Sequence, residues 1–270
     1  MDSPAPNSSN TPAGAASKRP VIAMENVHLA FGEQEILRGV TFSLKEKERL
    51  AVLGKSGGGK STLLRLVLGI LRPTKGSVQF NGLEVTRMGR HRLNRMRQKI
   101  GMVYQYSALV SSLNVRENLA LPLEELTEKD AKEIESIVME KLELVGMEES
   151  KDKMPAELSG GMRKRIGLAR ALVLNPEVIL YDEPSAGLDP VTSASIDELM
   201  ISLSEKIGTS SIIVTHEMDS AFKVATRMAM LYEGVIHAEG TAEEFRSHSD
   251  PVVAQFVSGA PDGPLTDEVG

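Results

Sequence analysis

Residues Gly54–Thr62 read GKSGGGKST, and they follow the apolar run RLAVL at residues 49–53. The spacing fits the phosphate-binding pattern G-x-x-x-x-G-K-[ST]. Glycines let several backbone N–H groups converge on phosphate oxygens, and a helix that begins at the lysine turns its positive end toward them. The stretch therefore predicts a phosphate loop between a buried strand and a helix. A flexible glycine-rich turn that matches by chance is the alternative, which this context disfavours.

Apolar runs on both sides of this loop predict an α/β fold. VIAMENVHLAF at residues 21–31 and EILRGVTFSL at residues 35–44 alternate as half-buried antiparallel strands do. RLAVL, VILYD at residues 178–182 and SIIVTH at residues 211–216 are instead continuous apolar runs. Runs of that kind, each followed by helical sequence, are typical of buried parallel strands.

Other segments have clear local signals. TKGSVQFNGLEV at residues 74–85 predicts a strand, an Asn-Gly turn and a second strand. Apolar residues recur at helical spacing after Lys60 and between residues 127 and 146. Asp250 before Pro251 predicts an N-cap and a short final helix over PVVAQFV. Met228 and Met230 are expected in a core strand, not in a ligand site.

Composition excludes several classes of protein. The net charge of −6 over 270 residues argues against a nucleic-acid backbone as the main partner. The absence of cysteine excludes disulfides and thiolate metal sites. No run of eighteen apolar residues and no secretory signal is found, so we expect a cytosolic chain. Residues 1–20 are expected to form a disordered tail; a transit peptide is the less favoured alternative.

A second stretch, from Leu158 to Pro184, reads LSGGMRKRIGLARALVLNPEVILYDEP. Its Ser-Gly-Gly loop has no lysine at the phosphate-contact position, and its apolar strand ends in Asp182 and Glu183. A carboxylate at a strand end can hold Mg²⁺, and its neighbour can accept a proton from water. By themselves these features would be a helix N-cap and ordinary strand-end residues. Together with the phosphate loop they predict nucleotide hydrolysis.

The chain resembles the ATP-binding cassette, or ABC, ATPases over about residues 21–248. LSGGM is similar to the family's signature loop, which usually ends in Gln; SAGLDP at residues 185–190 is similar to its D-loop. VTHE supplies its switch histidine, His216, and Gln105 in MVYQYSAL fits its Q-loop. The resemblance implies an α/β P-loop NTPase fold with a RecA-like core sheet, an antiparallel β subdomain and an α-helical subdomain at about residues 106–175.

The resemblance also implies the ligands, ATP and Mg²⁺, and the residues that hold them. Ser61, Gln105 and Asp182 would surround the metal, Glu183 would be the general base, and His216 would contact the γ-phosphate. Phe31 stands where the family has an aromatic ring that stacks on adenine, although a core role is equally open. The catalytic candidates are Lys60, Gln105, Glu183 and His216. The nucleotide-binding candidates are Phe31, Gly54, Ser56, Gly57, Gly58, Gly59, Lys60, Ser61, Thr62, Gln105, Ser159, Gly160, Gly161, Asp182, Asp189 and His216.

ABC cassettes pair head to tail, with ATP between the phosphate loop of one and the Ser-Gly-Gly loop of the other. The resemblance thus implies that this second loop serves the ATP of a second copy. A helix that begins after Ser159 would direct its N–H groups and dipole at the γ-phosphate, so no lysine is required. With one cassette and no predicted membrane span, the homodimer would dock on transmembrane permease subunits at the cytoplasmic face of the inner membrane.

Further stretches resemble one subtype, the ATPases of Mla-type and related Mce-linked lipid transporters. These stretches are residues 107–125, residues 154–172, in which the signature ends in Met162, and the tail at residues 251–270. The resemblance implies phospholipid transport, an Mce-domain protein in the complex, and a C-terminal extension that contacts a neighbouring subunit. The tail is expected to be ordered only there, and otherwise disordered. The alternatives are an ABC transporter of another solute and, less favoured, a non-transport ATPase that acts on nucleic acid.

The segment RMGRHRLNRMRQK at residues 87–99 carries five arginines and a lysine without an acidic residue. In isolation such a run indicates nucleic acid or anionic lipid. No aromatic residue is interleaved with these cations, so we expect a solvated helix face near a membrane-facing partner.

Overall fold

The computed structural model describes residues 19–266. The predicted tail at residues 1–20 therefore lies outside the described residues, apart from its last two positions. The same is true of residues 267–270, the end of the predicted C-terminal extension.

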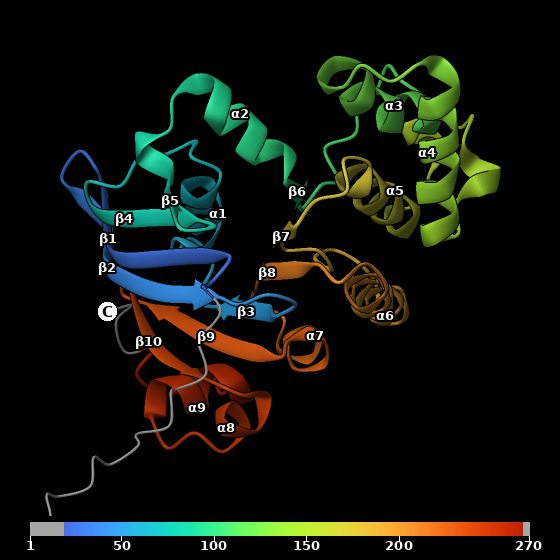
Figure 1. Ribbon diagram of the computed structural model, residues 1–270. Helices are drawn as coiled ribbons and strands as arrows, with labels where there is room; N and C mark the ends of the chain where they lie inside the picture. The colour runs from blue at the N-terminus through green and yellow to red at the C-terminus, as the bar shows by residue number, and fades with distance from the viewer. Residues whose placement is uncertain (1–18, 267–270) are drawn as a thin grey trace, which may run out of the picture.

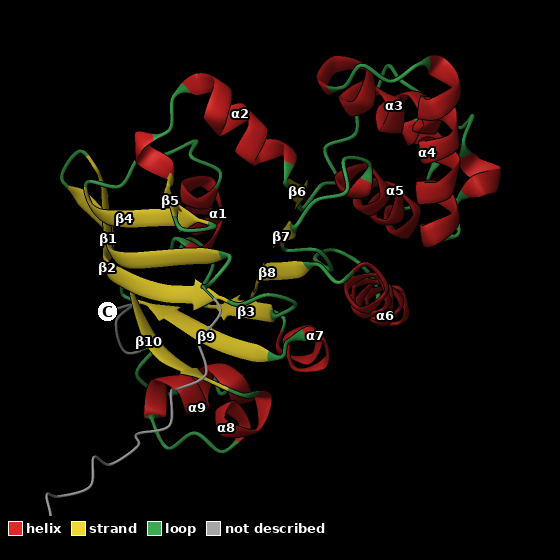
Figure 2. Cartoon of the chain, in the orientation of Figure 1, coloured by secondary structure: helices red, strands yellow, loops and turns green. Residues whose placement is uncertain are grey.

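Two sheets form the body of the chain (Figures 1 and 2). The first is antiparallel with the order β2-β1-β4-β5. Its strands are Ile22–Phe31 (β1), Gln34–Leu44 (β2), Lys75–Phe80 (β4) and Leu83–Glu84 (β5). The second has the order β10-β9-β3-β8-β7-β6 and is parallel except for β10. Its strands are Arg49–Leu53 (β3), Ile100–Val103 (β6), Val178–Asp182 (β7), Ser210–Thr215 (β8), Arg227–Tyr232 (β9) and Val235–Gly240 (β10).

The helices cover the mainly parallel sheet on both faces and gather in groups. Helices α3, α4 and α5 lie together on one side, while α8 and α9 lie at the opposite end (Figure 1). The helices are Lys60–Val67 (α1), Arg90–Gln98 (α2), Val115–Leu126 (α3), Ala131–Val145 (α4), Gly160–Leu172 (α5), Pro190–Ile207 (α6), Met218–Val224 (α7), Ala242–Arg246 (α8) and Pro251–Ser258 (α9). Short 3₁₀ turns lie at Val85–Arg87, Glu148–Ser150 and Pro155–Glu157.

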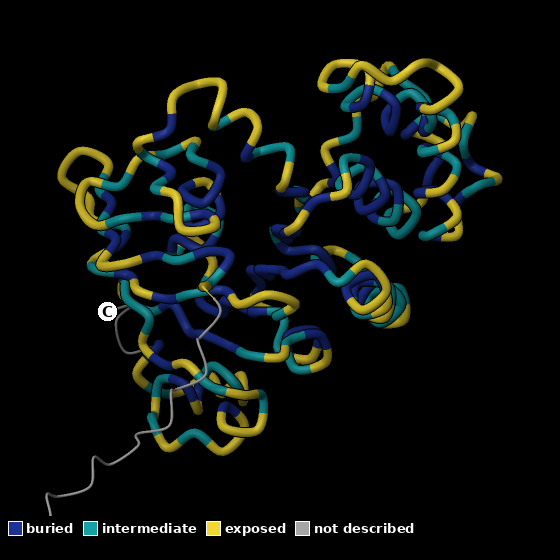
Figure 3. Tube along the Cα trace, in the orientation of Figure 1, coloured by how far each residue is buried: buried dark blue, intermediate teal, exposed yellow. Residues whose placement is uncertain are grey.

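The parallel strands have hydrophobic cores on both faces, which explains their continuous apolar sequences. Val178 and Leu180 of β7 face the core that includes α1 and the antiparallel sheet. Ile179 and Tyr181 face the opposite core, beneath the α3–α6 helices. Because successive side chains of a strand point to opposite faces, a strand with a core on each side has no polar alternation. Figure 3 shows these strands buried between more exposed helices.

Most of the local predictions are confirmed. The strands expected at residues 21–31 and 35–44 pair antiparallel, and the three continuous runs are parallel strands of one sheet. The helix expected between residues 127 and 146 runs from Ala131 to Val145, between an Asp130 capping box and the left-handed Gly146. The strand expected after the Asn-Gly turn is only two residues long, because the chain enters a 3₁₀ turn at Val85.

The C-terminal segment departs from the expectation that it is ordered only against another subunit. Helix α9 begins after Asp250, whose carboxylate accepts from two backbone N–H groups, as predicted. Beyond it, the Gln255 side chain accepts a hydrogen bond from the Leu265 N–H and donates to the Ala260 carbonyl. The Lys55 amine of the phosphate loop also donates to the Leu265 carbonyl. Contacts within the chain therefore order this segment as far as residue 266.

Across residues 19–266, no helix combines the length and apolar character required to cross a membrane.

Gly101 allows α5 to approach β6 closely, and this approach predicts a stability effect. A Cβ at Gly101 would lie 2.5 Å from the Ala171 carbonyl oxygen, which is backbone and cannot rotate away. We expect Gly101→Ala to lower the free energy of unfolding by about 1–3 kcal/mol, because overpacking forces backbone shifts. Urea denaturation measures the change. Gly89→Ala, where a Cβ would meet no atom within 4 Å, is the control and should cost less; equal losses would contradict the explanation.

Candidate functional site

Adjacent parallel strands bring the predicted loops to one edge of the sheet. In the register of β3, β8 and β7, Leu53 is paired with Thr215, and Val214 with Asp182. The phosphate loop follows Leu53, His216 follows Thr215, and Glu183 follows Asp182. Strand β6, next to β7, leads to Gln105. The carboxyl ends of parallel strands are the usual place for a ligand in such sheets.

The phosphate loop wraps around the amine of Lys60. Lys60 Nζ donates to the Gly54 carbonyl at 2.8 Å and to the Lys55 carbonyl at 3.1 Å. Gly54 has a φ of 154°, and a Cβ there would lie 2.5 Å from the Leu231 carbonyl oxygen, so only glycine fits. The N-terminus of α1 opens from Gly59, at φ 95°. Burial lowers the pKa of Lys60, and the nearby Glu183 partly opposes this shift.

Ser61 and Asp182 form the predicted metal-binding pair. The Ser61 hydroxyl donates to Asp182 Oδ1 at 2.7 Å. Among the described residues, no group of three or more His, Cys, Asp or Glu side chains is arranged to hold a metal ion. One hydroxyl and one carboxylate fit Mg²⁺, which binds through few protein oxygens and takes its remaining ligands from nucleotide phosphates and water. These residues therefore fit a metal that arrives with a nucleotide.

Glu183 lies between Lys60 and His216. Its Oε1 is 3.6 Å from Lys60 Nζ, and its Oε2 is 3.0 Å from His216 Nδ1. The His216 backbone N–H also donates to Oε2, at 3.3 Å. The Glu183 backbone is left-handed, with a φ of 50°, and its N–H donates to the Val214 carbonyl. A non-glycine residue held in this conformation is unusual and is often found at functional sites.

One pocket of about 310 Å³ contains most of the candidates. It is lined by Ser56, Gly57, Gly59, Lys60, Ser61, Thr62, Gln105, Glu183 and His216. Asp182 lies next to this pocket through its hydrogen bond to Ser61. Phe31 is 52% exposed at the end of β1, so the core alternative is wrong for its ring. Its contact with adenine stays a prediction.

The signature and D-loop residues lie apart from this pocket. Ser159 caps α5 by accepting from the Met162 N–H, and Asp189 caps α6 by accepting from two N–H groups. The two loops lie side by side, because a Cβ on Gly160 would meet Leu188 and one on Gly161 would meet Thr192. None of these residues lines the phosphate pocket. The structure therefore brings the candidates into two groups on one chain.

Sequence reasoning missed one residue near the pocket, Lys164. It is only 6% exposed, and its amine donates to the Gln105 carbonyl at 2.6 Å and to the Glu183 carbonyl at 3.2 Å. The sequence signal for Lys164 is its spacing of four and eight residues from Leu168 and Leu172, which places a lysine on the apolar face of α5.

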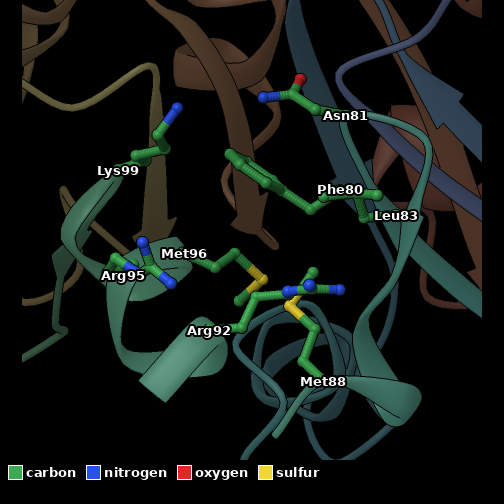
Figure 4. A pocket seen from close by; sticks show the side chains of 8 residues that line it. All are labelled: Phe80, Asn81, Leu83, Met88, Arg92, Arg95, Met96 and Lys99. Atoms are coloured by element: carbon green, nitrogen blue, oxygen red, sulfur yellow. The ribbon is translucent and has the colours of Figure 1, made fainter. Parts of the chain in front are cut away.

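The basic segment forms helix α2 and the rim of a separate groove. This groove has a volume of about 530 Å³, with Phe80, Met88 and Met96 at its floor and Arg92, Arg95 and Lys99 at its rim (Figure 4). Four of the five arginines are exposed, which confirms a solvated helix face, whereas Arg97 is half-buried and donates to the carbonyls of Leu68 and Gly69. A partner at this face stays a prediction.

This fold and pocket define the chain as a P-loop nucleoside triphosphatase. The comparisons narrow the class, because the family model described as ABC transporter matches residues 37–186. The chain belongs to the ABC transporter family.

Three relatives illustrate this membership. The chain is 41% identical to the probable ribonucleotide transport ATP-binding protein mkl of Mycobacterium leprae (strain TN). The 244 matched residues cover 90% of this chain and 70% of the relative. It is 36% identical to the intermembrane phospholipid transport system ATP-binding protein MlaF of Escherichia coli (strain K12). The 245 matched residues cover 91% of this chain and 91% of that relative. The dimeric post-hydrolysis structure of the cassette MJ0796 bound to ADP and Pi has a TM-score of 0.74 at 31% identity, covering 82% of this chain and 98% of that one.

The chain is therefore the ATP-binding subunit of an ABC transporter and an ATPase, with the α/β cassette fold that the sequence predicted.

The position of Glu183 predicts the behaviour of its amide variant. Glu183→Gln keeps the hydrogen bonds of the backbone and most of the side-chain shape but removes the proton acceptor. We expect ATP affinity to persist and turnover to fall by at least about a hundredfold, as is usual when a general base is lost. Nucleotide titration and phosphate release measure the two effects.

Glu177→Gln is the matched control for this variant. Glu177 precedes β7 and Glu183 follows it, and Glu177 pairs with Lys99 at the far edge of the sheet. Its variant should retain turnover. Retention of most ATPase activity by Glu183→Gln would contradict the general-base role.

Proposed function

We propose that two copies of this chain close head to tail over ATP and thereby drive phospholipid transport between two membranes. The observation that carries the dimer is the division of the candidates into two groups. The pocket supplies Lys60, Glu183 and His216 on one side of a nucleotide, while Ser159 is exposed at the start of α5. The free N–H groups at such a helix start bind anions, so a second copy would complete the site.

The residues of the pocket have distinct roles in this proposal. Lys60 and the loop N–H groups bind the phosphates, and Ser61, Asp182 and Gln105 hold Mg²⁺. The bound metal would supply positive charge against the developing negative charge of the phosphoryl group. The Glu183 carboxylate accepts the proton of the attacking water. His216 Nδ1 contacts Glu183, which leaves Nε2 as the ring nitrogen that would contact the γ-phosphate.

The remaining partners follow from the same proposal. The ATPase homodimer docks on transmembrane permease subunits and is thereby held at the cytoplasmic face of the inner membrane. Residues 21–248 form the ATPase domain, in which the helical subdomain spans about residues 106–175 and moves with the signature loop. The C-terminal extension, residues 249–270, contacts the neighbouring ATPase.

The relatives favour a lipid substrate but also supply a second candidate. MlaF belongs by name to an intermembrane phospholipid transport system, and it matches this chain over 91% of both lengths. An Mce-domain protein in the complex would fit that system. The protein mkl is named for ribonucleotide transport at 41% identity. Transport of another solute is therefore the alternative function.

Complementation tests the head-to-tail dimer. Lys60→Ala should disable the phosphate loop and Ser159→Arg the signature loop, so each variant alone should be nearly inactive. A mixed dimer would contain one site with both loops intact. Mixing equal amounts should restore about a quarter of wild-type activity if partners exchange freely and sites act independently. Phosphate release measures the recovery; its absence, with dimers present by light scattering, would contradict shared sites.

Purification of the native complex tests the substrate class. We expect the tagged chain, extracted gently from membranes, to carry a multi-span permease, an Mce-domain protein and bound phospholipid, as mass spectrometry would reveal. A truncation after Gly259 should weaken recovery of the complex, because it removes the proposed subunit contact. A solute-binding protein in place of the Mce protein would overturn the lipid substrate but not the ATPase role.

A further inference from the structure

Lys164 connects three elements of the cassette through its amine. It lies in α5, about one and a half turns after the Ser159 cap. Its Nζ donates to the Gln105 carbonyl at 2.6 Å and to the Glu183 carbonyl at 3.2 Å. One buried cation therefore joins the signature helix to the backbone of two residues whose side chains line the phosphate pocket.

Burial makes this arrangement costly, so its oxygen partners matter. Lys164 is 6% exposed, and burial lowers its pKa, while the carboxylates of Glu217 and Glu183 partly oppose the shift. An ammonium group removed from water must recover hydration energy from protein oxygens. Loss of the amine would remove the Gln105 carbonyl's contact at 2.6 Å and leave the Glu183 carbonyl with the Ala186 N–H at 3.3 Å. Displacement of either carbonyl would leave the cation under-solvated.

The backbone that Lys164 holds is itself in an unusual conformation. Glu183 has a φ of 50°, and Ser107 and Ala108, which follow Gln105, have φ values of 60° and 47°. Left-handed conformations of non-glycine residues persist only where surrounding contacts hold them. The contact to the Glu183 carbonyl is one of these, so the direction of the Glu183 carboxylate depends on the position of α5.

The same face of α5 also contacts the Q-loop backbone that follows Gln105. Arg170 donates to the Ala108 carbonyl at 2.7 Å and to the Ser107 carbonyl at 2.9 Å. Between the two cations, Gly167 lies so close to Ser107 that a Cβ on it would be 3.2 Å from the Ser107 Cβ. Lys164, Gly167 and Arg170 are spaced by three residues and therefore share one helix face. This helix face therefore packs directly against the Q-loop backbone.

We propose that Lys164 is a positioning residue that transmits the engagement of one ATP to the catalytic residues of the other site. The inference rests on the proposed head-to-tail dimer, in which Ser159 of α5 contacts the ATP held by the second copy. Movement of α5 toward that ATP displaces the Lys164 amine and, with it, the carbonyls of Gln105 and Glu183 in its own site. Each cassette thus adjusts its own pocket when its signature loop is occupied.

Kinetics of a matched pair of variants test this role. Lys164→Met keeps the unbranched stem but removes the donor. Lys141→Met is the control, because Lys141 is also buried, at 5% exposed, and its amine also contacts two oxygens, of Glu140 and Asn175, away from the pocket. We expect Lys164→Met to lower kcat by about tenfold to hundredfold with KM for MgATP changed less than about twofold, as for misplaced catalytic groups. Lys141→Met should leave both constants unchanged.

Hydrogen exchange of the ATP-bound dimer provides a readout that does not depend on turnover. In the Glu183→Gln background, ATP should protect both the signature loop, residues 158–162, and the Q-loop, residues 103–110. Addition of Lys164→Met should abolish the protection of the Q-loop while that of the signature loop remains. Addition of Lys141→Met should change neither. Where Lys164→Met does not fold, Lys164→Leu, which also lacks a donor, carries the same comparison.

The outcomes separate this inference from the dimer on which it rests. Full Q-loop protection in Lys164→Met, or an equal loss of kcat in Lys141→Met, overturns the positioning role while the dimer stands. Lack of signature-loop protection by ATP in the Glu183→Gln parent overturns the dimer and the inference with it.

Discussion

The register of parallel strands β3, β8 and β7 is the constraint on which the rest of the site depends. It places Leu53 beside Thr215 and Val214 beside Asp182, so three loops leave the sheet at the same edge. Hydrogen bonds between strands fix these positions more firmly than loop contacts could. The phosphate loop, the predicted metal-binding pair and the Glu183–His216 pair therefore meet at one pocket.

The signature-loop and D-loop residues are positioned by helices and not by strand ends. Ser159 and Asp189 each cap a helix, so their positions depend on α5 and α6 and not on strand ends. In the proposed dimer, closure of a site divided in this way would require α5 and α6 to move as units relative to the sheet. Lys164 and Arg170 make buried contacts between α5 and the loop that follows β6. Such contacts would transmit a movement of the helix to the pocket.

Sequence reasoning performed best where a local rule had a direct structural consequence. The continuous run VILYD predicted a strand with a core on each face, and Asp250–Pro251 predicted the start of α9. It was weaker where tertiary contacts decide. The strand expected after the Asn-Gly turn is two residues long. The segment after α9 is ordered by the side chains of Gln255 and Lys55, and no local sequence pattern predicts either contact.

The sequence by itself determined the class of fold and nearly all of the phosphate pocket, because a phosphate loop, a strand-end carboxylate pair and their order along the chain are local patterns with few structural solutions. Only the tertiary structure decided that Lys164 points its amine at the carbonyls of Gln105 and Glu183. Backbone carbonyls carry no residue identity. A side chain that acts on them therefore leaves little trace in the sequence, and its partners appear only when the helix is packed against the sheet.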